Sequence, residues 1–376
     1  MSKVSEIKSL IEAGGKYTVL SEFTEGANGY AFKGHHKHLQ CDMFLKVIDA
    51  DSEADKTFAE PRALRDALAN GSCENLVRLH DAEHLTGSYI LMSMEYMEGG
   101  SLNNLITDRS LGQMDAVQIA LGVLGGLGHL HKARFLHRDV KPGNLLIKNS
   151  DTSIVPKLGD FGSVRRLEAQ EHKVAASRHS ALYRPPEAWG DGGWFTFSSD
   201  LYQAAICLYE MVNGPLPYTF EPYLDAQAKK MMKAKGIQSF VEMDTFERSQ
   251  MSDGCLERRI KTNKLLEMTP PQPYFSKRLA AIVRKATAID PSHRFQNAYE
   301  FHNSLQGLSA PNWLIDGKDF MASSWKTWDW KVTSSIRVPK DDWIVLRARQ
   351  GTSQYRRYGD GYASAKLACV SVEQFS

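Results

Sequence analysis

The sequence predicts an α+β protein with two lobes and a small C-terminal module. Residues 17–48 hold short β-prone runs separated by glycines and polar turns, which is typical of a small antiparallel sheet. Between residues 115 and 288 apolar residues recur at helical spacing, which indicates a mainly helical second lobe. After Pro311 four tryptophans follow in close succession, at positions 313, 325, 328 and 330, so a further module is predicted there.

The expected elements follow in chain order. Strands are predicted over residues 17–23, 30–33, 43–48, 76–80 and 89–96, and helices over residues 55–69, 115–132, 200–212 and 276–288. Pro61 must lie in the first turn of its helix, because a proline further inside would break it. The polar segment 218–274 is left open. In the tail, strands are predicted around residues 343–349 and 354–358, with a covering helix over residues 363–375.

Composition and charge exclude several classes of protein. The 376 residues are 42% hydrophobic and 24% charged, as in globular proteins, and the net charge of +2 creates no strong field for nucleic acid or anionic lipid. No run reaches the roughly 18 apolar residues of a spanning helix, so no membrane partner is expected. The five cysteines form no CxxC pair, which indicates reduced thiols in a cytoplasmic protein.

The stretch from His137 to Asn144, HRDVKPGN, carries the most chemical information. Phosphoryl transfer needs a carboxylate, a cation and a metal ligand close together. Asp139 can orient an attacking hydroxyl and accept its proton, Lys141 can neutralise charge on the transferred group, and Asn144 can bind a metal. The alternative for such a stretch alone is a charged surface loop.

A second short motif, Asp160-Phe161-Gly162, follows about sixteen residues later and supplies a carboxylate for Mg²⁺. By itself it would be read as an ordinary turn. The two motifs in this order resemble the protein kinase family. The resemblance implies a bilobal protein-kinase fold over residues 16–309, with lobes at about 16–97 and 98–309, between an N-terminal extension (1–15) and a module of unknown function (310–376). Lys141 and Pro142 resemble the serine/threonine branch, which implies protein substrates that carry Ser or Thr.

The same resemblance implies an ATP site with Mg²⁺, or alternatively Mn²⁺, as the metal. Residues 24–31 resemble the glycine-rich loop over the phosphates, although Thr24 replaces the first glycine. Lys46 matches the strand lysine that pairs with the α- and β-phosphates, although Phe44 stands where the family usually has Ala and Ala31 where it usually has Val. The nucleotide-binding positions implied in this way are Thr24, Gly26, Gly29, Ala31, Lys46, Leu146 and the hinge residues Met94, Glu95 and Met97.

Glu60 is the predicted partner of Lys46, because Leu64 follows one turn later on the same face of the helix. Glu53 is the alternative. A solvated glutamate without a specific role is the ordinary reading of such a position.

Further matches imply structural and regulatory positions. Residues 180–187 resemble the end of the activation segment, in which Ser180 would contact Asp139 and Lys141. Glu187 would form a buried ion pair with Arg294, and Asp200 would fix the backbone of the catalytic loop. Arg138 is the position that often binds a phosphate in the activation segment, and Ser177 is the preferred phosphorylation site, with an unmodified loop serine as the alternative.

Two questions remain open at this point. The tail alternates aromatic and basic residues, a pattern that could stack on bases and pair with phosphates, but Asp341, Asp342 and Asp360 dilute the charge, so a protein-docking module or a plain core sheet is favoured over nucleic-acid binding. The alternatives to an active protein kinase are a pseudokinase that acts as a binding scaffold and a kinase of small molecules; residues 180–187 argue against the latter. The oligomeric state is not predicted.

Overall fold

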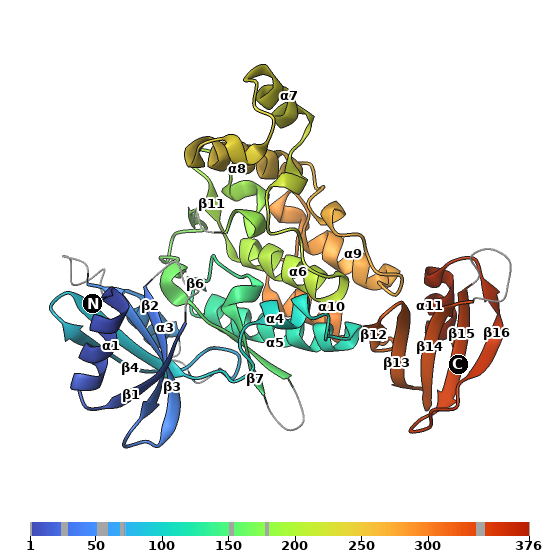
Figure 1. Cartoon of the computed structure of the whole chain (residues 1–376), viewed down its shortest axis with the longest axis horizontal. Coiled ribbons are helices and arrows are strands. Elements are labelled where there is room, and N and C mark those ends of the chain that lie inside the picture. The colour runs from blue at the N-terminus through green and yellow to red at the C-terminus, as the bar shows by residue number, and fades with distance from the viewer. Residues whose placement is uncertain are drawn as a thin grey trace.

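The computed structural model has two lobes in a row, followed by a C-terminal module (Figure 1). It describes residues 2–23, 29–50, 59–67, 71, 73–149, 154–176, 180–335 and 343–375. The N-lobe (blue) lies at one end of the molecule and the module (red) at the other, with the helical C-lobe between them. The predicted α+β class and kinase-like architecture are confirmed.

The N-lobe is built on a five-stranded antiparallel sheet in the order β1-β2-β3-β5-β4. One face of the sheet buries Phe32, Leu45 and Val47, and the positions between them are only partly buried, as the two-residue period of a strand requires. The strands are β1 (Tyr17–Phe23), β2 (Tyr30–His36), β3 (Cys41–Asp49), β4 (Leu79–Thr86) and β5 (Tyr89–Glu95).

The predicted strand at residues 76–80 overlaps β4 only at residues 79 and 80. Leu76 forms only an isolated bridge to Leu158, and the Val77 N–H donates to the carbonyl of that same leucine over 2.9 Å. This apolar pair is therefore held by a hairpin of the C-lobe, and the sheet strand β4 starts at Leu79. β4 is an edge strand with charged residues, and such strands lack the apolar run on which the prediction relied.

Two helices flank this sheet. The helix α1 (Lys3–Ala13) begins at the N-cap Ser2 and buries Ile7 and Ile11 in the same apolar cluster as Phe32 and Leu45. The helix α3 (Ala59–Ala67) has Pro61 in its first turn, as predicted, and buries Leu64. The rest of the predicted range 55–69 lies outside the described residues.

The C-lobe is assembled around two long helices, α5 (Gln113–Lys132) and α6 (Phe197–Asn213). α6 is buried nearly all round, since other elements of the lobe, α5 foremost, pack against it. The predicted helices at 115–132, 200–212 and 276–288 are thus confirmed, and the open segment 218–274 holds two more. The other helices of this lobe are α4 (Leu102–Thr107), α7 (Ala226–Ala234), α8 (Thr245–Lys261), α9 (Lys277–Ala286) and α10 (Ala298–Gln306).

Short strands of the C-lobe carry the chemically important loops. β7 (Leu145–Asn149) pairs with β8 (Ile154–Leu158), and Leu145 lies opposite Leu158 in the register. The catalytic loop ends where β7 begins and the Asp-Phe-Gly turn follows β8, so both reach the same end of one hairpin. The small pairs β6 (Phe135–Leu136) with β9 (Arg165–Arg166), and β10 (Val174–Ala175) with β11 (Trp194–Phe195), brace the surrounding segments.

The C-terminal module is a five-stranded antiparallel sheet, β12 to β16 in sequence order, covered by α11 (Ala365–Glu373). Its core is continuous with that of the C-lobe, because the buried Trp313 stacks on Tyr274, with ring centroids 6.4 Å apart. The predicted strand at 354–358 starts later and runs on to Tyr362. The strands are β12 (Trp313–Asp316), β13 (Asp319–Trp325), β14 (Trp328–Ser334), β15 (Trp343–Arg349) and β16 (Arg356–Tyr362).

In the part of the chain that the structure describes, no helix combines the length and apolar character needed to cross a bilayer.

Candidate active site

Lys46 is the centre of an ion-pair cluster that joins three segments. Its Nζ donates to both carboxylate oxygens of Glu60 on α3, each over 3.0 Å, and to Asp160 Oδ1 over 3.0 Å. Burial alone would lower the pKa of Lys46, but the two carboxylates outweigh burial and raise it. Burial would likewise raise the pKa of Asp160, yet the nearby ammonium lowers it. Burial raises the pKa of Glu60, although the Lys46 ammonium opposes this effect. The structure places Glu60 beside Lys46, whereas the alternative Glu53 lies outside the described residues.

Asp139 is held at the base of the site by its own loop. Its Oδ2 accepts hydrogen bonds from Lys141 Nζ and Asn144 Nδ2, each over 2.9 Å. Its other oxygen, Oδ1, is buried and has no hydrogen-bond partner among the described residues. A buried carboxylate oxygen left without a donor is rare in folded proteins, so it suggests a functional acceptor.

Asn144 and Asp160 offer oxygen atoms that suit a hard cation. Both N–H groups of the Asn144 amide are used on Asp139, since Nδ2 also donates to the Asp139 carbonyl over 2.8 Å, and this leaves the amide oxygen for a metal. The backbone carbonyl of Asn144 accepts a hydrogen bond from the Gly159 N–H over 2.9 Å. Asp160 is the next residue after Gly159, so this bond holds Asp160 close to Asn144. A carboxylate and an amide oxygen fit Mg²⁺, which completes its shell with water and phosphate oxygens. Among the described residues, no cluster of three or more His, Cys, Asp or Glu provides a metal site made of protein ligands alone.

Asp200 fixes the backbone of the loop at residues 137–144, which carries Asp139 and Asn144. It is fully buried in the first turn of α6, and its carboxylate accepts from the N–H groups of His137 over 2.9 Å and Arg138 over 2.8 Å. These bonds hold Arg138 at a φ of 66°, a conformation that is costly for a side chain larger than glycine and is common at functional sites. Asp160 has a similar φ of 56°.

Three supporting residues were missed at the sequence level. His131 Nε2 is hydrogen-bonded to Asp200 over 2.8 Å, and Gln203 Oε1 accepts from the Val140 N–H over 3.0 Å. His137 Nε2 donates to the Gly159 carbonyl over 3.1 Å and so ties the two loops together. Gln203 lies three residues after Asp200, which puts both on one face of a helix, and that spacing was a usable signal.

Among the predicted nucleotide-binding positions that the structure describes, Gly29 comes just before β2, Met97 follows β5, and the others lie on strands. Gly29 has a φ of 123°, and a Cβ there would meet the Val47 carbonyl oxygen at 2.4 Å, so only glycine fits. Ala31 lies opposite Lys46 across β2 and β3, and the side chains of Met94 and Met97 are buried, while Leu146 on β7 is partly exposed. The predicted positions Thr24 and Gly26 lie outside the described residues. Phe44 packs on Phe23, with ring centroids 5.6 Å apart.

Glu95 is held through its side chain as well as its backbone. Its Oε1 accepts from the ammonium of the buried Lys157 over 2.8 Å and from the Arg78 N–H over 2.7 Å, and its own N–H donates to the Arg78 carbonyl. Of its backbone groups, the carbonyl is therefore the one left for the predicted contact with the nucleotide.

Ser180 meets one of its two predicted partners. Its hydroxyl accepts from Lys141 Nζ over 2.9 Å. No hydrogen bond joins it to Asp139 among the described residues. Lys141 bridges the two residues instead, because its ammonium donates to both.

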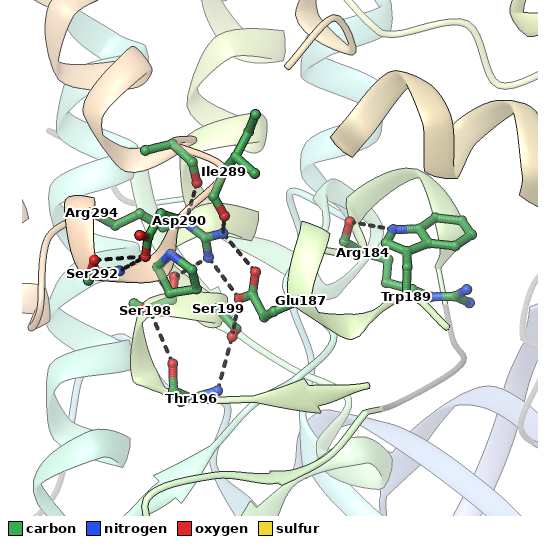
Figure 2. Close-up of polar contacts among 12 residues, drawn as sticks. Arg184, Glu187, Trp189, Thr196, Ser198, Ser199, Ile289, Asp290, Ser292 and Arg294 are labelled. Atoms are coloured by element: carbon green, nitrogen blue, oxygen red, sulfur yellow. Dashed lines mark hydrogen bonds and ion pairs between the residues drawn. The ribbon is translucent and has the colours of Figure 1, made fainter. Parts of the chain in front are cut away.

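Glu187 and Arg294 form a bidentate ion pair (Figure 2). Arg294 Nη1 and Nη2 donate to the two carboxylate oxygens of Glu187 over 2.8 and 2.7 Å, and the Ser199 hydroxyl donates to the same carboxylate over 2.6 Å. The remaining guanidinium N–H groups are satisfied by backbone carbonyls, among them that of Ala288 at 2.7 Å from Nε. Paired and hydrogen-bonded charges of this kind can be buried without a large penalty.

The fold and this arrangement of ionic groups are those of the protein kinase class. In agreement, residues 17–304 match the protein kinase domain family, and the chain belongs to that family. It is 30% identical over 297 residues to the serine/threonine-protein kinase PknL of Mycobacterium bovis, and 25% identical over 341 residues to the serine/threonine-protein kinase PrkC of Bacillus subtilis. These alignments cover 78% and 89% of this chain, but only 66% and 46% of the relatives.

Proposed function

We propose that the chain transfers the γ-phosphate of ATP to Ser or Thr hydroxyls of protein substrates, with Mg²⁺, or alternatively Mn²⁺, bound by Asn144 and Asp160. The observation that carries the proposal is the convergence of two ionic clusters at one end of the β7–β8 hairpin. One is Lys46 with Glu60 and Asp160, and the other is Asp139 with Lys141 and Asn144.

Each residue then has a role that follows from its contacts. Lys46, fixed by Glu60, positions the α- and β-phosphates, while Asp139 Oδ1 receives the hydrogen bond and then the proton of the acceptor hydroxyl. Lys141 stabilises negative charge that develops on the transferred group. A metal bound there would neutralise negative charge on the phosphate oxygens.

Protein acceptors are supported by the segment around Ser180 and by the buried ion pair that anchors its end. Lys141 donates a hydrogen bond to Ser180, and the ion pair of Glu187 with Arg294 anchors the other end of the segment on the C-lobe. Residues 180–187 are therefore held at both ends and form a surface next to the loop that carries Asp139. A preformed surface of this kind favours an extended peptide over a small molecule.

Arg138 supports regulation by phosphorylation. Burial, followed by the charge of Arg165, lowers the pKa of its guanidinium, and its Nε has no hydrogen-bond partner among the described residues. A phosphate dianion would stabilise the charged guanidinium and would accept a hydrogen bond from Nε. Ser177, which lies outside the described residues, is the preferred modified position. It comes two residues after Ala175, whose carbonyl accepts a hydrogen bond from Arg138 Nη1 over 3.1 Å.

Ser177→Ala should lower the rate of phosphoryl transfer and remove one phosphate seen by mass spectrometry. An unchanged rate together with an unchanged phosphate content would refute the site.

A cytoplasmic location is proposed from the cysteines, since all five are free thiols and two of them, Cys207 and Cys255, are buried in the C-lobe.

The transfer reaction is tested with labelled ATP and Mg²⁺, using wild-type protein and Asp139→Asn. We expect label on Ser or Thr, located by mass spectrometry, and a rate about 10²- to 10⁴-fold lower in the variant. Equal labelling of both proteins would identify a contaminating kinase. ATP binding without any label in the wild type would instead identify a pseudokinase scaffold.

A further inference from the structure

A large open groove lies where the C-terminal module meets the C-lobe. Its volume is about 850 Å³, and it runs between one side of α9, the segment 271–275 before that helix, and the first turn of α11. Figure 1 shows this junction at the end of the molecule that is remote from the N-lobe. The groove is therefore separate from the proposed ATP site.

The charged residues of the groove are all of one sign. Lys277 and Arg284 on α9 and Lys366 on α11 line it, and no acidic side chain does. All three are exposed, and none of them forms an ion pair within the described parts of the chain. Glu267 belongs to the neighbouring turn but is not part of the lining. The first turn of α11 adds the positive end of a nine-residue helix to these cations.

Part of the groove lining is apolar, beside the polar residues Asn263, Gln272, Thr287 and Ser364. Phe275 and Val283 are buried there, and Tyr209 packs edge-on against Phe275 with ring centroids 5.6 Å apart. The Tyr209 hydroxyl is already bonded to the Thr269 carbonyl over 2.6 Å, so this residue presents its ring and not a polar group. The groove thus offers apolar contact below and positive charge at the rim.

The spacing of the cations matches an extended chain. Lys277 and Arg284 are seven residues apart, which places them on one face of α9 at a separation of about 10 Å along its axis. Side chains on one face of an extended peptide repeat about every 7 Å, so carboxylates two or four residues apart, at about 7 or 13 Å, bracket this separation, and the long Lys and Arg side chains can reach either spacing. A single small anion could meet only one of these two positions.

We propose that this groove binds an acidic peptide segment in which Asp or Glu residues alternate with apolar residues. Carboxylates would pair with Lys277, Arg284 and Lys366, and apolar side chains would pack on Phe275 and Val283. A substrate or activator protein with such a segment would be recruited away from the catalytic cleft. The binding itself does not depend on phosphoryl transfer.

The test uses the full chain and a fluorescein-labelled 12-residue peptide of alternating Glu and Leu, with a Gln-for-Glu peptide as its control. The groove variant is Lys277→Glu/Arg284→Glu/Lys366→Glu. Its matched control, Lys229→Glu/Lys230→Glu/Lys233→Glu, makes the same change of charge on α7, far from the groove in Figure 1. Fluorescence anisotropy gives the Kd of each pair, and the thermal unfolding midpoint checks each fold.

Binding of the Glu peptide should be at least about tenfold tighter than that of the Gln peptide, and the groove variant should lose about tenfold or more while the α7 variant loses less than threefold. Equal losses in both variants, or equal binding of both peptides, would overturn the proposal. Tighter binding of a single-stranded 12-nucleotide DNA would also overturn it, in favour of nucleic acid. If the triple variant does not fold, Arg284→Glu against Lys230→Glu tests the same difference.

Discussion

Glu187 and Arg294 are 107 residues apart in the chain, yet their side chains are only 4% and 0% exposed and meet through two charged hydrogen bonds. The pair links the end of the activation segment to the turn before α10. The Arg294 guanidinium also lies over the ring of Tyr202 on α6, 4.9 Å from its centroid. Three segments of the C-lobe are therefore joined at one buried charge pair.

Removing one partner of this pair should be far more damaging than removing both. Arg294→Met leaves the Glu187 carboxylate buried without its counter-charge, so we expect the free energy of unfolding to fall by about 3–5 kcal/mol. Urea unfolding measures this change. The double variant Glu187→Gln/Arg294→Met should recover part of the loss, because no unpaired charge remains. A double variant that is no more stable than Arg294→Met would contradict the argument.

Lys46→Met should slow phosphoryl transfer by about 10²- to 10³-fold, because the phosphates lose the one cation that Glu60 and Asp160 hold in place. The rate is measured at saturating ATP, with the unfolding midpoint as the check on the fold. Lys33→Met serves as the control, since Lys33 is also on the N-lobe sheet but pairs with Asp42 instead. A transfer rate within threefold of wild type for Lys46→Met would count against the assigned role.

Glu210 should make stability depend on pH. It is fully buried on α6, and burial raises its pKa to about 7, even though the Tyr183 hydroxyl and the Leu216 N–H donate to it. Between about pH 5 and pH 7 the folded protein keeps a proton that the unfolded chain has lost, so stability falls as pH rises through this window. The full effect is on the order of 3 kcal/mol.

Glu210→Gln removes that titration and allows both hydrogen bonds, because the Gln oxygen can accept from the Leu216 N–H and its NH2 group can donate to the Tyr183 hydroxyl oxygen. The difference in unfolding free energy between variant and wild type should therefore grow in favour of the variant from pH 5 to pH 8. Glu373, whose pKa burial also raises to about 7, is present in both proteins and cancels. A difference that does not change with pH would show that Glu210 is ionised in the folded protein throughout.

Asn312 joins the C-terminal module to the C-lobe by capping a helix. Gly112, the N-cap residue of α5, has no side chain that could accept a hydrogen bond from the first turn. Asn312 Oδ1 supplies this acceptor, because it binds the Met114 N–H over 2.8 Å. Asn312→Ala should lower the free energy of unfolding by about 1 kcal/mol, measured in urea. Gly112→Ala should also destabilise, since its Cβ would lie 2.1 Å from Asn312 Oδ1. A neutral effect of both changes would show that the cap contributes nothing.

Local sequence patterns were sufficient for much of the fold and for the proposed catalytic residues. The strands β1, β3 and β5 and the helix α5 follow directly from apolar periodicity. Asp139, Asn144 and Asp160 were found because a short motif keeps its members adjacent. Glu60 could be chosen from the face of its helix, and the structure places it beside Lys46.

Other features depend on contacts that no local pattern reveals. The helix α1 has only Ile7 and Ile11 as buried residues, too few for a clear periodic signal, and its place on the N-lobe sheet is settled by packing. The cap that Asn312 provides for α5 comes from about 200 positions further along the chain, which is beyond the reach of a capping motif. Leu76 was assigned to a strand because it is apolar, although its partner is Leu158 of the other lobe.

The most direct test of the central claim is the dependence of ATP binding on Mg²⁺, measured by isothermal titration calorimetry for wild-type protein and Asp160→Asn. If Lys46, Asp139, Asn144 and Asp160 act on one metal–nucleotide complex, Mg²⁺ will tighten ATP binding to the wild type by about tenfold or more, and the variant will lose this gain. Binding of ATP that is equally tight with Mg²⁺ and with EDTA in the wild type, or a full Mg²⁺ effect in the variant, would contradict it.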